Sequence, residues 1–305
     1  MGCVRWRKGL SFPMRIVHLL AILPAILYGT VAHADREFGE YWNQGKAEIT
    51  SYALEQARYG EIHEGRAVLV FVTEPFNPEK QVKADRPTTS SVPVLKLNLT
   101  KKFNTGIYPY SMMLSVFTPV DLAKYPHTFK TTVSVQEWCG HAWTQLNWRD
   151  DAYQAQLRSY FESEADQDFS AGNAMLEDEV WTRIRLAPDE LVTGETTMIP
   201  GGLDARLRHR LQQPEKVVAT LEPRGEFKVY TLEYPELKRT LRITFEADFP
   251  HRIEGWEETA ESGWGEDAKM LTTKATLKKR LLTDYWNHHD NVDRPMRLEL
   301  GLPED

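Results

Sequence analysis

Apolar and polar residues alternate with a period of two along much of this chain. Leu95, Leu97 and Leu99 alternate with polar residues, and the same alternation runs from 240 to 249. This pattern predicts strands that have one buried and one solvent-exposed face. The stretch 67–72 is apolar throughout and rich in β-branched residues, which predicts a strand buried on both faces.

Further strand-like segments follow one another closely. Strands are also predicted over 47–56, 106–118, 128–148, 153–164, 226–234, 252–259 and 269–282. Turn-forming residues separate them at His63-Glu64-Gly65, Phe76-Asn77-Pro78, Arg149-Asp150-Asp151, Pro223-Arg224-Gly225 and Ser262-Gly263. Short turns and few helices predict a mainly β fold, which is an antiparallel curved sheet or an incomplete β-barrel with one or two short helices.

Two segments have helical periodicity instead. Over 174–187, the apolar residues Leu176, Val180 and Ile184 share a face, acidic residues fill the first turn, and arginines lie in the last. A shorter helix is predicted to hold Leu203, Leu207 and Leu211.

The chain begins with the three parts of a secretory signal peptide. Basic residues precede an apolar run, 16–27, and the small-x-small sequence Ala32-His33-Ala34 follows it. This run is shorter than the ~20 apolar residues that a transmembrane helix needs. The sequence therefore predicts a signal peptide over 1–34, cleavage after Ala34, no transmembrane anchor, and a periplasmic or secreted protein. Translation can start at Met1 or at Met14.

The remaining residues, 35–305, are predicted to form a single β-rich domain, with two sub-lobes if the helices near 174–212 divide it. Cleavage removes four positive charges, which moves the net charge from −7 to −11. A chain this acidic repels nucleic-acid phosphates and anionic lipid headgroups, so neither nucleic acid nor an anionic lipid surface is an expected primary partner. Only Cys139 remains after cleavage, so an internal disulfide framework is excluded.

The segment around Cys139 carries the most suggestive side chains. On a regular strand, Glu137, Cys139 and His141 would share a face with Trp143, spaced about 6–7 Å apart. A cysteine nucleophile needs a nearby base or cation, so Cys139 with His141 makes a hydrolase or transferase one hypothesis, with Glu137 as a third candidate. This spacing is long for a direct hydrogen bond, which favours either a polar cluster lining a ligand cavity or a buried cysteine that packs as a small hydrophobe.

Aromatic residues crowd the middle of the chain. The stretch 107–114, which contains Tyr108 and Tyr110, has no clean polar face. It is either buried on both sides or part of an apolar lining that leaves a cavity for an amphiphile. The ligand-binding residues predicted from these patterns are Glu137, Cys139, His141, Trp143, Tyr108 and Tyr110.

No metal or cofactor site is predicted. His288-His289-Asp290 contains metal-ligating residue types, but the asparagines around it favour a solvated turn. The acidic run 254–261 lacks the pattern of a calcium-binding loop.

Several segments together resemble a family of exported bacterial proteins that is uncharacterised. The similarity covers most of 35–305, and it is carried by Glu61 to Asp85, Val94 to Ser111, Gln136 to His141 and Arg252 to Glu258. Some members carry the label "septum formation inhibitor Maf". True Maf proteins are cytoplasmic nucleotide pyrophosphatases with a Ser-x-Ser-Pro-Arg-Arg motif, which this chain lacks, so the resemblance implies no catalytic residue. The strand pattern is also similar to the curved sheets of periplasmic lipoprotein carriers, which hold acyl chains.

These observations lead to one main expectation about function. The sequence predicts an exported, soluble envelope protein of unknown function, non-enzymatic, that binds a lipid-like or amphiphilic ligand on the concave face of its sheet. Two alternatives stay open, which are the hydrolase or transferase that uses Cys139 and His141, and an envelope assembly or interaction protein. Oligomeric state is left open.

Overall fold

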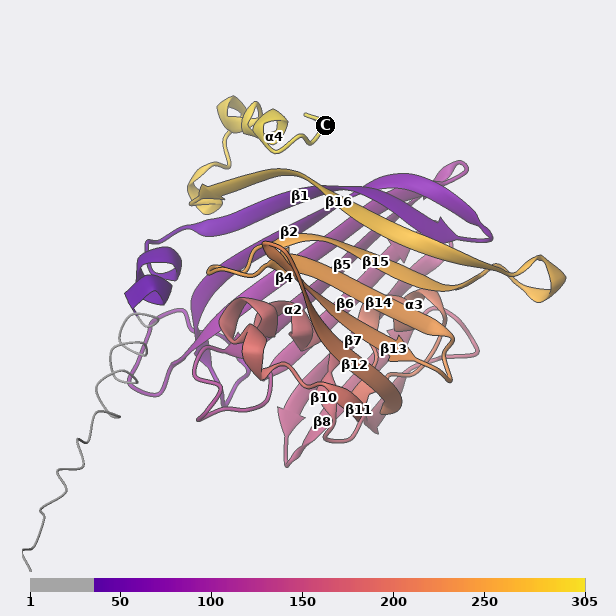
Figure 1. The fold of residues 1–305 in the computed structure, drawn as a ribbon, viewed down its shortest axis with the longest axis horizontal. Coiled ribbons are helices and arrows are strands. Elements are labelled where there is room, and N and C mark those ends of the chain that lie inside the picture. The colour runs from indigo at the N-terminus through magenta and orange to yellow at the C-terminus, as the bar shows by residue number, and fades with distance from the viewer. Residues whose placement is uncertain (1–35, 305) are drawn as a thin grey trace, which may run out of the picture.

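The computed structural model describes residues 36–304, and the predicted signal peptide, 1–34, lies outside this range. The described chain forms one large curved sheet of sixteen strands with short helices (Figure 1). The strands are β1 (Ala47–Arg58), β2 (Glu61–Asn77), β3 (Val82–Lys83), β4 (Val92–Thr105), β5 (Tyr108–Pro119), β6 (Lys130–Glu137), β7 (Gly140–Arg149), β8 (Ala152–Ser159), β9 (Gln167–Ser170), β10 (Met175–Leu176), β11 (Gly194–Ile199), β12 (Glu215–Arg224), β13 (Phe227–Tyr234), β14 (Arg239–Glu246), β15 (Ile253–Ser262) and β16 (Lys269–Thr283). The α-helices are 36–42, α2 (Glu177–Leu186), α3 (Gly202–Leu207) and α4 (Met296–Glu299).

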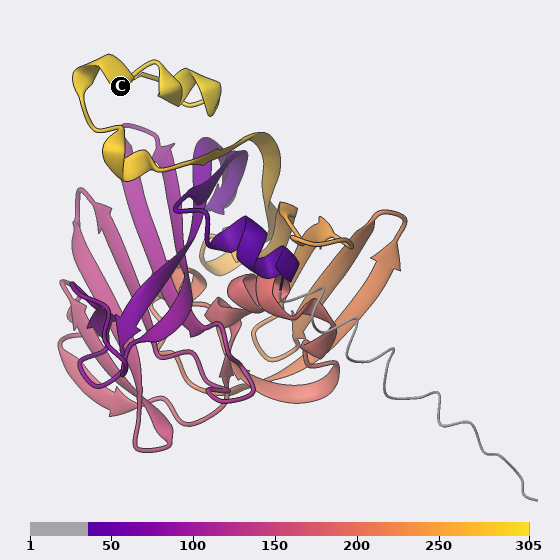
Figure 2. The same ribbon diagram turned by 90° about the vertical axis from the view of Figure 1, so that its left-hand side faces the viewer.

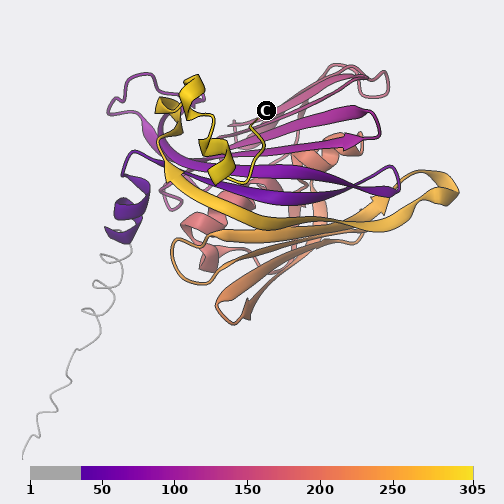
Figure 3. The same cartoon turned by 90° about the horizontal axis from the view of Figure 1, so that it is seen from above.

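Neighbouring strands of the sheet are antiparallel, except for the short parallel pair β10–β11. The order is β10-β11-β12-β13-β14-β15-β16-β1-β2-β4-β5-β6-β7-β8-β9, and β3 pairs with β2 outside this path. Strand β16 pairs with β1, so a ladder between the two ends of the described chain joins the halves of the sheet (Figure 3).

The two edge strands of the sheet, β9 and β10, follow each other in the sequence. The curl of the sheet therefore has to bring its two edges close together. Strand β9 ends at Ser170 and β10 begins at Met175, although the two lie at opposite ends of the strand order. Five residues of chain reach less than about 20 Å, so the edges approach each other without pairing. The predicted incomplete barrel is therefore confirmed (Figure 2).

Helix α2 lies inside the curled sheet and fills the centre of its concave face (Figure 1). Its Val180, Trp181 and Ile184 are buried, and the Trp181 ring packs edge-on against Trp256 of β15 at 5.2 Å between centroids. The apolar face predicted for this helix therefore packs against the apolar face of the strands. The middle of the concave face is therefore filled by α2.

Ion pairs fix both ends of α2 to the sheet. Glu177 in the first turn accepts two hydrogen bonds from Arg239 of β14, at 2.6 and 2.7 Å. Arg185 in the last turn donates two to Glu48 of β1, at 2.7 and 2.8 Å. All four side chains are buried, so each charge has its partner where water is excluded.

Two predicted boundaries are wrong. The stretch 128–148 is a hairpin of β6 and β7, because Trp138 and Cys139 form a two-residue turn. The predicted turn at His63-Glu64-Gly65 lies inside β2, where Gly65 allows close packing on β4, since a Cβ there would lie 2.4 Å from the Lys102 carbonyl oxygen. The true turn is Tyr59-Gly60, whose positive φ angles of 55° and 78° suit a tight hairpin.

The segment after β16 folds back outside the sheet (Figure 3). The Ser51 hydroxyl of β1 donates a hydrogen bond to the Leu300 carbonyl, which ties this segment to the seam between β1 and β16. His288-His289-Asp290 lies in an exposed loop here, as predicted. Within residues 36–304, no helix combines the length and apolar character that membrane crossing requires.

Candidate functional site

Antiparallel pairing brings several turns to one end of the curled sheet. Four hairpins have their tips there. Their last paired residues are Arg58 with Glu61, Thr105 with Tyr108, Glu137 with Gly140, and Ser262 with Lys269. We call it the tip end. Helix α3 and the residues after it also reach this end (Figure 1). Residues that are far apart in the sequence thereby meet around one opening.

Two cavities lie side by side at the tip end. A polar chamber of about 420 Å³ lies between α3, β15 and the turn after β13, and an aromatic chamber of about 190 Å³ lies against β6 and β7. Four residues line both chambers and form the boundary between them: Arg58, Tyr59, Leu207 and Trp264.

The boundary is held by specific contacts. The Arg58 guanidinium donates a hydrogen bond to the Leu207 carbonyl at the end of α3, and it lies over the Tyr59 ring, 4.3 Å from the centroid. The Trp264 ring packs on Tyr59 with 5.0 Å between centroids. Trp264 is nevertheless 71% exposed, so it forms part of the rim of the opening.

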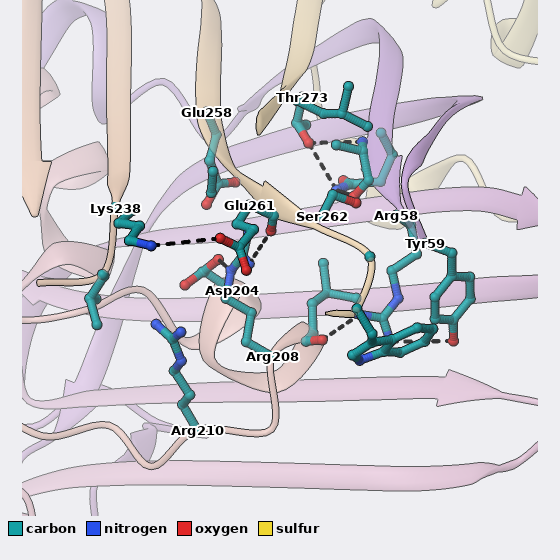
Figure 4. A pocket seen from close by; sticks show the side chains of 18 of the residues that line it. Arg58, Tyr59, Asp204, Arg208, Arg210, Lys238, Glu258, Glu261, Ser262 and Thr273 are labelled. Atoms are coloured by element: carbon teal, nitrogen blue, oxygen red, sulfur yellow. Dashed lines mark hydrogen bonds and ion pairs between the residues drawn. The ribbon is translucent and has the colours of Figure 1, made fainter. Parts of the chain in front are cut away.

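Acidic residues of the polar chamber mostly have cationic partners (Figure 4). Asp204 of α3 accepts a hydrogen bond from Arg208 at 2.5 Å, and Glu258 of β15 accepts one from Arg239 at 2.6 Å. Although burial raises the pKa of Glu258, the charges of Arg239 and Lys101 lower it to about 2. Glu258 is therefore an anion whose charge is already balanced within the protein.

A buried acid behind this chamber behaves differently. Burial, followed by the neighbouring charge of Glu177, raises the pKa of Asp178 to about 7. Its carboxyl group accepts a hydrogen bond from the Gly202 amide at 3.0 Å, which places it between α2 and the start of α3. Burial thus brings the pKa of Asp178 close to neutral pH, and it also raises the pKa of Asp204 on α3.

Two cations of the polar chamber lack carboxylate partners within the described chain. The Arg58 guanidinium contacts the Leu207 carbonyl and the hydroxyls of Tyr59 and Tyr110, and its Nε–H is buried without a hydrogen-bond partner among residues 36–304. Arg210 follows α3 and is exposed, and Figure 4 shows its side chain at the chamber with no ion pair drawn to it.

The aromatic chamber has an apolar wall. Val135 of β6 and Ala142 of β7 are paired across the hairpin and point into it, together with Leu207 of α3 and the Phe161 ring. The Tyr110 hydroxyl, which bonds to that of Tyr59 at 2.6 Å, adds a polar group. The chamber therefore offers apolar surface next to a cation.

The structure brings part of the predicted ligand-binding set together. Tyr110, Glu137 and Cys139 line the aromatic chamber, and the Tyr108 ring packs on Tyr110 with 5.8 Å between centroids. His141 pairs with Gln136 and lies one position away from the inward-pointing Ala142, so its exposed side chain is on the outer face. The same alternation directs Trp143 away from the chamber.

The geometry opposes the thiol chemistry that the sequence suggested. The hairpin turn separates Cys139 from the face of His141, so the shared face predicted for Glu137, Cys139 and His141 is wrong. Cys139 is exposed at the tip, where the Glu137 carboxylate accepts its backbone N–H at 2.7 Å and raises the pKa of its thiol. A raised pKa disfavours the thiolate that a nucleophile needs.

Sequence reasoning missed the residues that form the boundary between the chambers. Arg58 and Tyr59 end a strand and start a turn, and Trp264 follows the turn at Gly263, so each looks like an ordinary hairpin residue. Within residues 36–304, no group of three or more His, Cys, Asp or Glu side chains is arranged to hold a metal ion.

Comparison with known proteins finds a similar solved structure but no matching family. No family model matches the chain, and no curated protein matches it. Among solved structures, it is similar to a β-barrel-like protein of domain of unknown function DUF1849 from Brucella abortus, with a TM-score of 0.42 and 10% identity, covering 78% of this chain and 98% of that chain. Membership of the exported bacterial family stays a prediction.

Proposed function

We propose that this protein is an exported, non-enzymatic envelope protein that binds an amphiphile in the paired chambers at the tip end. The observation that carries the proposal is the contact between an apolar chamber and a polar one across a shared boundary. A lipid-like molecule has the matching division into an apolar body and a polar head. Together the chambers have the size of small-molecule sites, about 300–1,000 Å³.

The position of the chambers supports this function and refines the expectation from the sequence. Helix α2 occupies the middle of the concave face, so the space for a ligand lies at the end of the sheet. Exposed aromatic side chains surround the opening, among them Trp264 and Trp138, which are 71% and 68% exposed. Rings of this kind give an apolar ligand a surface to contact as it enters.

Binding can be measured with a neutral fluorescent amphiphile. We expect purified protein of residues 35–305, freed of bound lipid, to bind N-phenyl-1-naphthylamine saturably, with displacement by a monoacylglycerol. Ala142→Trp should weaken binding at least about tenfold, because the new ring fills the aromatic chamber.

His141→Trp is the matched control, because it adds a ring at the next position but on the outer face. It should bind the probe as the wild type does. Thermal melts followed by circular dichroism show whether both variants are folded. Absence of saturable binding to the wild type would overturn the proposal, and so would equal affinity of a folded Ala142→Trp variant.

A further inference from the structure

Some charged side chains of the polar chamber form ion pairs within the protein, and others do not. Asp204 and Glu258 are neutralised by arginines of the protein itself. Lys238 lies 3.9 Å from Glu261 on the side of the chamber away from Arg58 (Figure 4). Within residues 36–304, neither Arg58 nor Arg210 forms an ion pair with a carboxylate, and the exposed Glu236, which also lines the chamber, forms none with a cation.

Arg58 is held in place rather than left free in solvent. The Tyr59 and Tyr110 rings lie 4.3 and 5.6 Å from its guanidinium carbon, and the Leu207 carbonyl accepts one of its N–H groups. These neutral contacts orient the guanidinium and leave its net charge unbalanced. A half-buried cation without a counter-ion gains most from an anion that arrives with a ligand.

Its location connects this cation to both parts of a bound molecule. Arg58 lines the aromatic chamber and the polar chamber, so an anion at the boundary reaches it while an apolar body packs against Val135 and Ala142. Arg210 also lines the polar chamber, on the same side as Lys238 and apart from Arg58 (Figure 4).

We infer that the ligand of this site is an anionic amphiphile, whose carboxylate or phosphate head group is recognised by Arg58 although the chain as a whole is acidic, and that Arg210 adds positive charge to the same chamber. The inference rests on the proposed binding function and adds the charge of the ligand to it. Arginine suits both head groups, since its planar fork donates two parallel hydrogen bonds to either one.

The test uses three amphiphiles of equal chain length in competition with N-phenyl-1-naphthylamine. Dodecanoate carries a carboxylate, dodecyl phosphate carries a phosphate, and 1-dodecanol is neutral. We expect the wild type to bind at least one of the two anions about tenfold or more tightly than 1-dodecanol, because charge-assisted hydrogen bonds are the strong ones. The stronger of the two anions identifies the head-group chemistry.

Substitutions assign the preference to the arginines. Arg58→Gln should abolish most of the preference for the anion over 1-dodecanol, whereas Arg58→Lys should keep part of this preference. Arg210→Gln, at an exposed position where misfolding is not expected, should reduce the preference a few-fold. Arg224→Gln is the control, since the exposed Arg224 ends β12 at the opposite end of the sheet and its pairing with Glu222 is loose, at 3.6 Å.

The outcomes separate this inference from the function on which it rests. If the wild type binds 1-dodecanol as tightly as both anions, the inference is wrong and amphiphile binding stands. If none of the three displaces the probe and the probe itself does not bind, both are wrong. The inference is also wrong if the two single variants, Arg58→Gln and Arg210→Gln, are folded and both keep the full wild-type preference for the anion over 1-dodecanol.

Discussion

Arg185 shows how a single buried side chain can hold distant parts of this protein together. Its guanidinium donates to both carboxylate oxygens of Glu48 and to the Pro250 carbonyl, and it lies over the Trp42 and Phe71 rings at 4.9 and 4.6 Å. The pair is fully desolvated, so its Coulomb attraction is offset by the cost of removing two charges from water. What the pair fixes is the position of α2 against β1.

Removal of one partner should therefore cost much more than removal of both. We expect Arg185→Met or Glu48→Gln alone to lower the free energy of unfolding by about 3–5 kcal/mol, because a buried charge is left unpaired. The double variant should lose clearly less than the sum, as urea unfolding will measure. Glu222→Gln, in the exposed pair with Arg224, is the control and should change stability by less than about 0.5 kcal/mol. Additive losses in the double variant would contradict this account.

The environment of Cys139 predicts slow alkylation in spite of full exposure. The Glu137 carboxylate raises the pKa of the thiol, which lowers the fraction present as thiolate at neutral pH. Glu137→Gln removes this charge, so iodoacetamide should label the variant a few-fold faster than the wild type at pH 7.5. Because Cys139 is the only cysteine after residue 34, mass spectrometry of residues 35–305 reports it directly. A slower or unchanged rate in the variant would exclude this role for Glu137.

The sequence could indicate some of the candidate site but not its key cation. Tyr110 and Glu137 were predictable because aromatic and polar residues crowd those strands. Arg58 was not, since an arginine at a strand end is common and its partners Tyr110 and Leu207 lie 52 and 149 positions further along the chain. Only the curl of the sheet brings these three together.

At the scale of elements, the junction of α2 and α3 contains a titrating acid. Asp178, with a pKa raised to about 7 by burial, is protonated in the folded protein at pH values where the unfolded chain has already lost the proton. The folded state then binds more protons than the unfolded state between about pH 4 and 7. Stability should consequently fall as pH rises through this window and level off above it.

Asp178→Asn isolates that contribution, because asparagine keeps an acceptor for the Gly202 amide and cannot ionise. Relative to the variant, the wild type should lose on the order of 1 kcal/mol of stability per pH unit toward pH 7. Urea midpoints at several pH values between 5 and 8 measure this difference. The exposed Asp166→Asn variant should follow the wild type at every pH. Parallel curves for the wild type and Asp178→Asn would exclude a raised pKa.

Elements with clean periodicity were predictable, and those set by tertiary contacts were not. The strands β1, β5, β13 and β16 follow the predicted ranges closely, and so does α2, whose apolar face matches its burial. Strands β11 and β12 escaped prediction because they have mixed patterns, and β12 carries a proline within it. The shortness of α3 was also unpredictable, since the chain leaves the helix after Leu207 and Leu211 stays outside it.

At the scale of the whole molecule, one packed core connects strands from both halves of the chain. Buried residues of β1, β2, β4 and β5 belong to the same cluster as those of β13, β14 and β15, and α2 lies between them. The closing ladder of β16 with β1 adds backbone hydrogen bonds between the halves. If the chain has the two sub-lobes that the sequence allowed, they share one hydrophobic core and the β1–β16 ladder.

This shared core makes a specific prediction about unfolding. Residues 35–305 should unfold in one transition, with coincident curves from far-ultraviolet circular dichroism and from tryptophan fluorescence, because neither half can lose its strands without exposing the core residues of the other.

Ala275 of β16 tests the pairing between β16 and β1. It is 3% exposed and lies opposite both Leu54 of β1 and Trp256 of β15. Ala275→Asp buries a charge there and should lower the free energy of unfolding by several kcal/mol. The midpoint of the single transition should fall accordingly. Lys274→Ala, at the neighbouring position on the other face, should leave the midpoint nearly unchanged. Two separate transitions in the wild type, or a loss of only one of them in Ala275→Asp, would show instead that the halves are independent lobes.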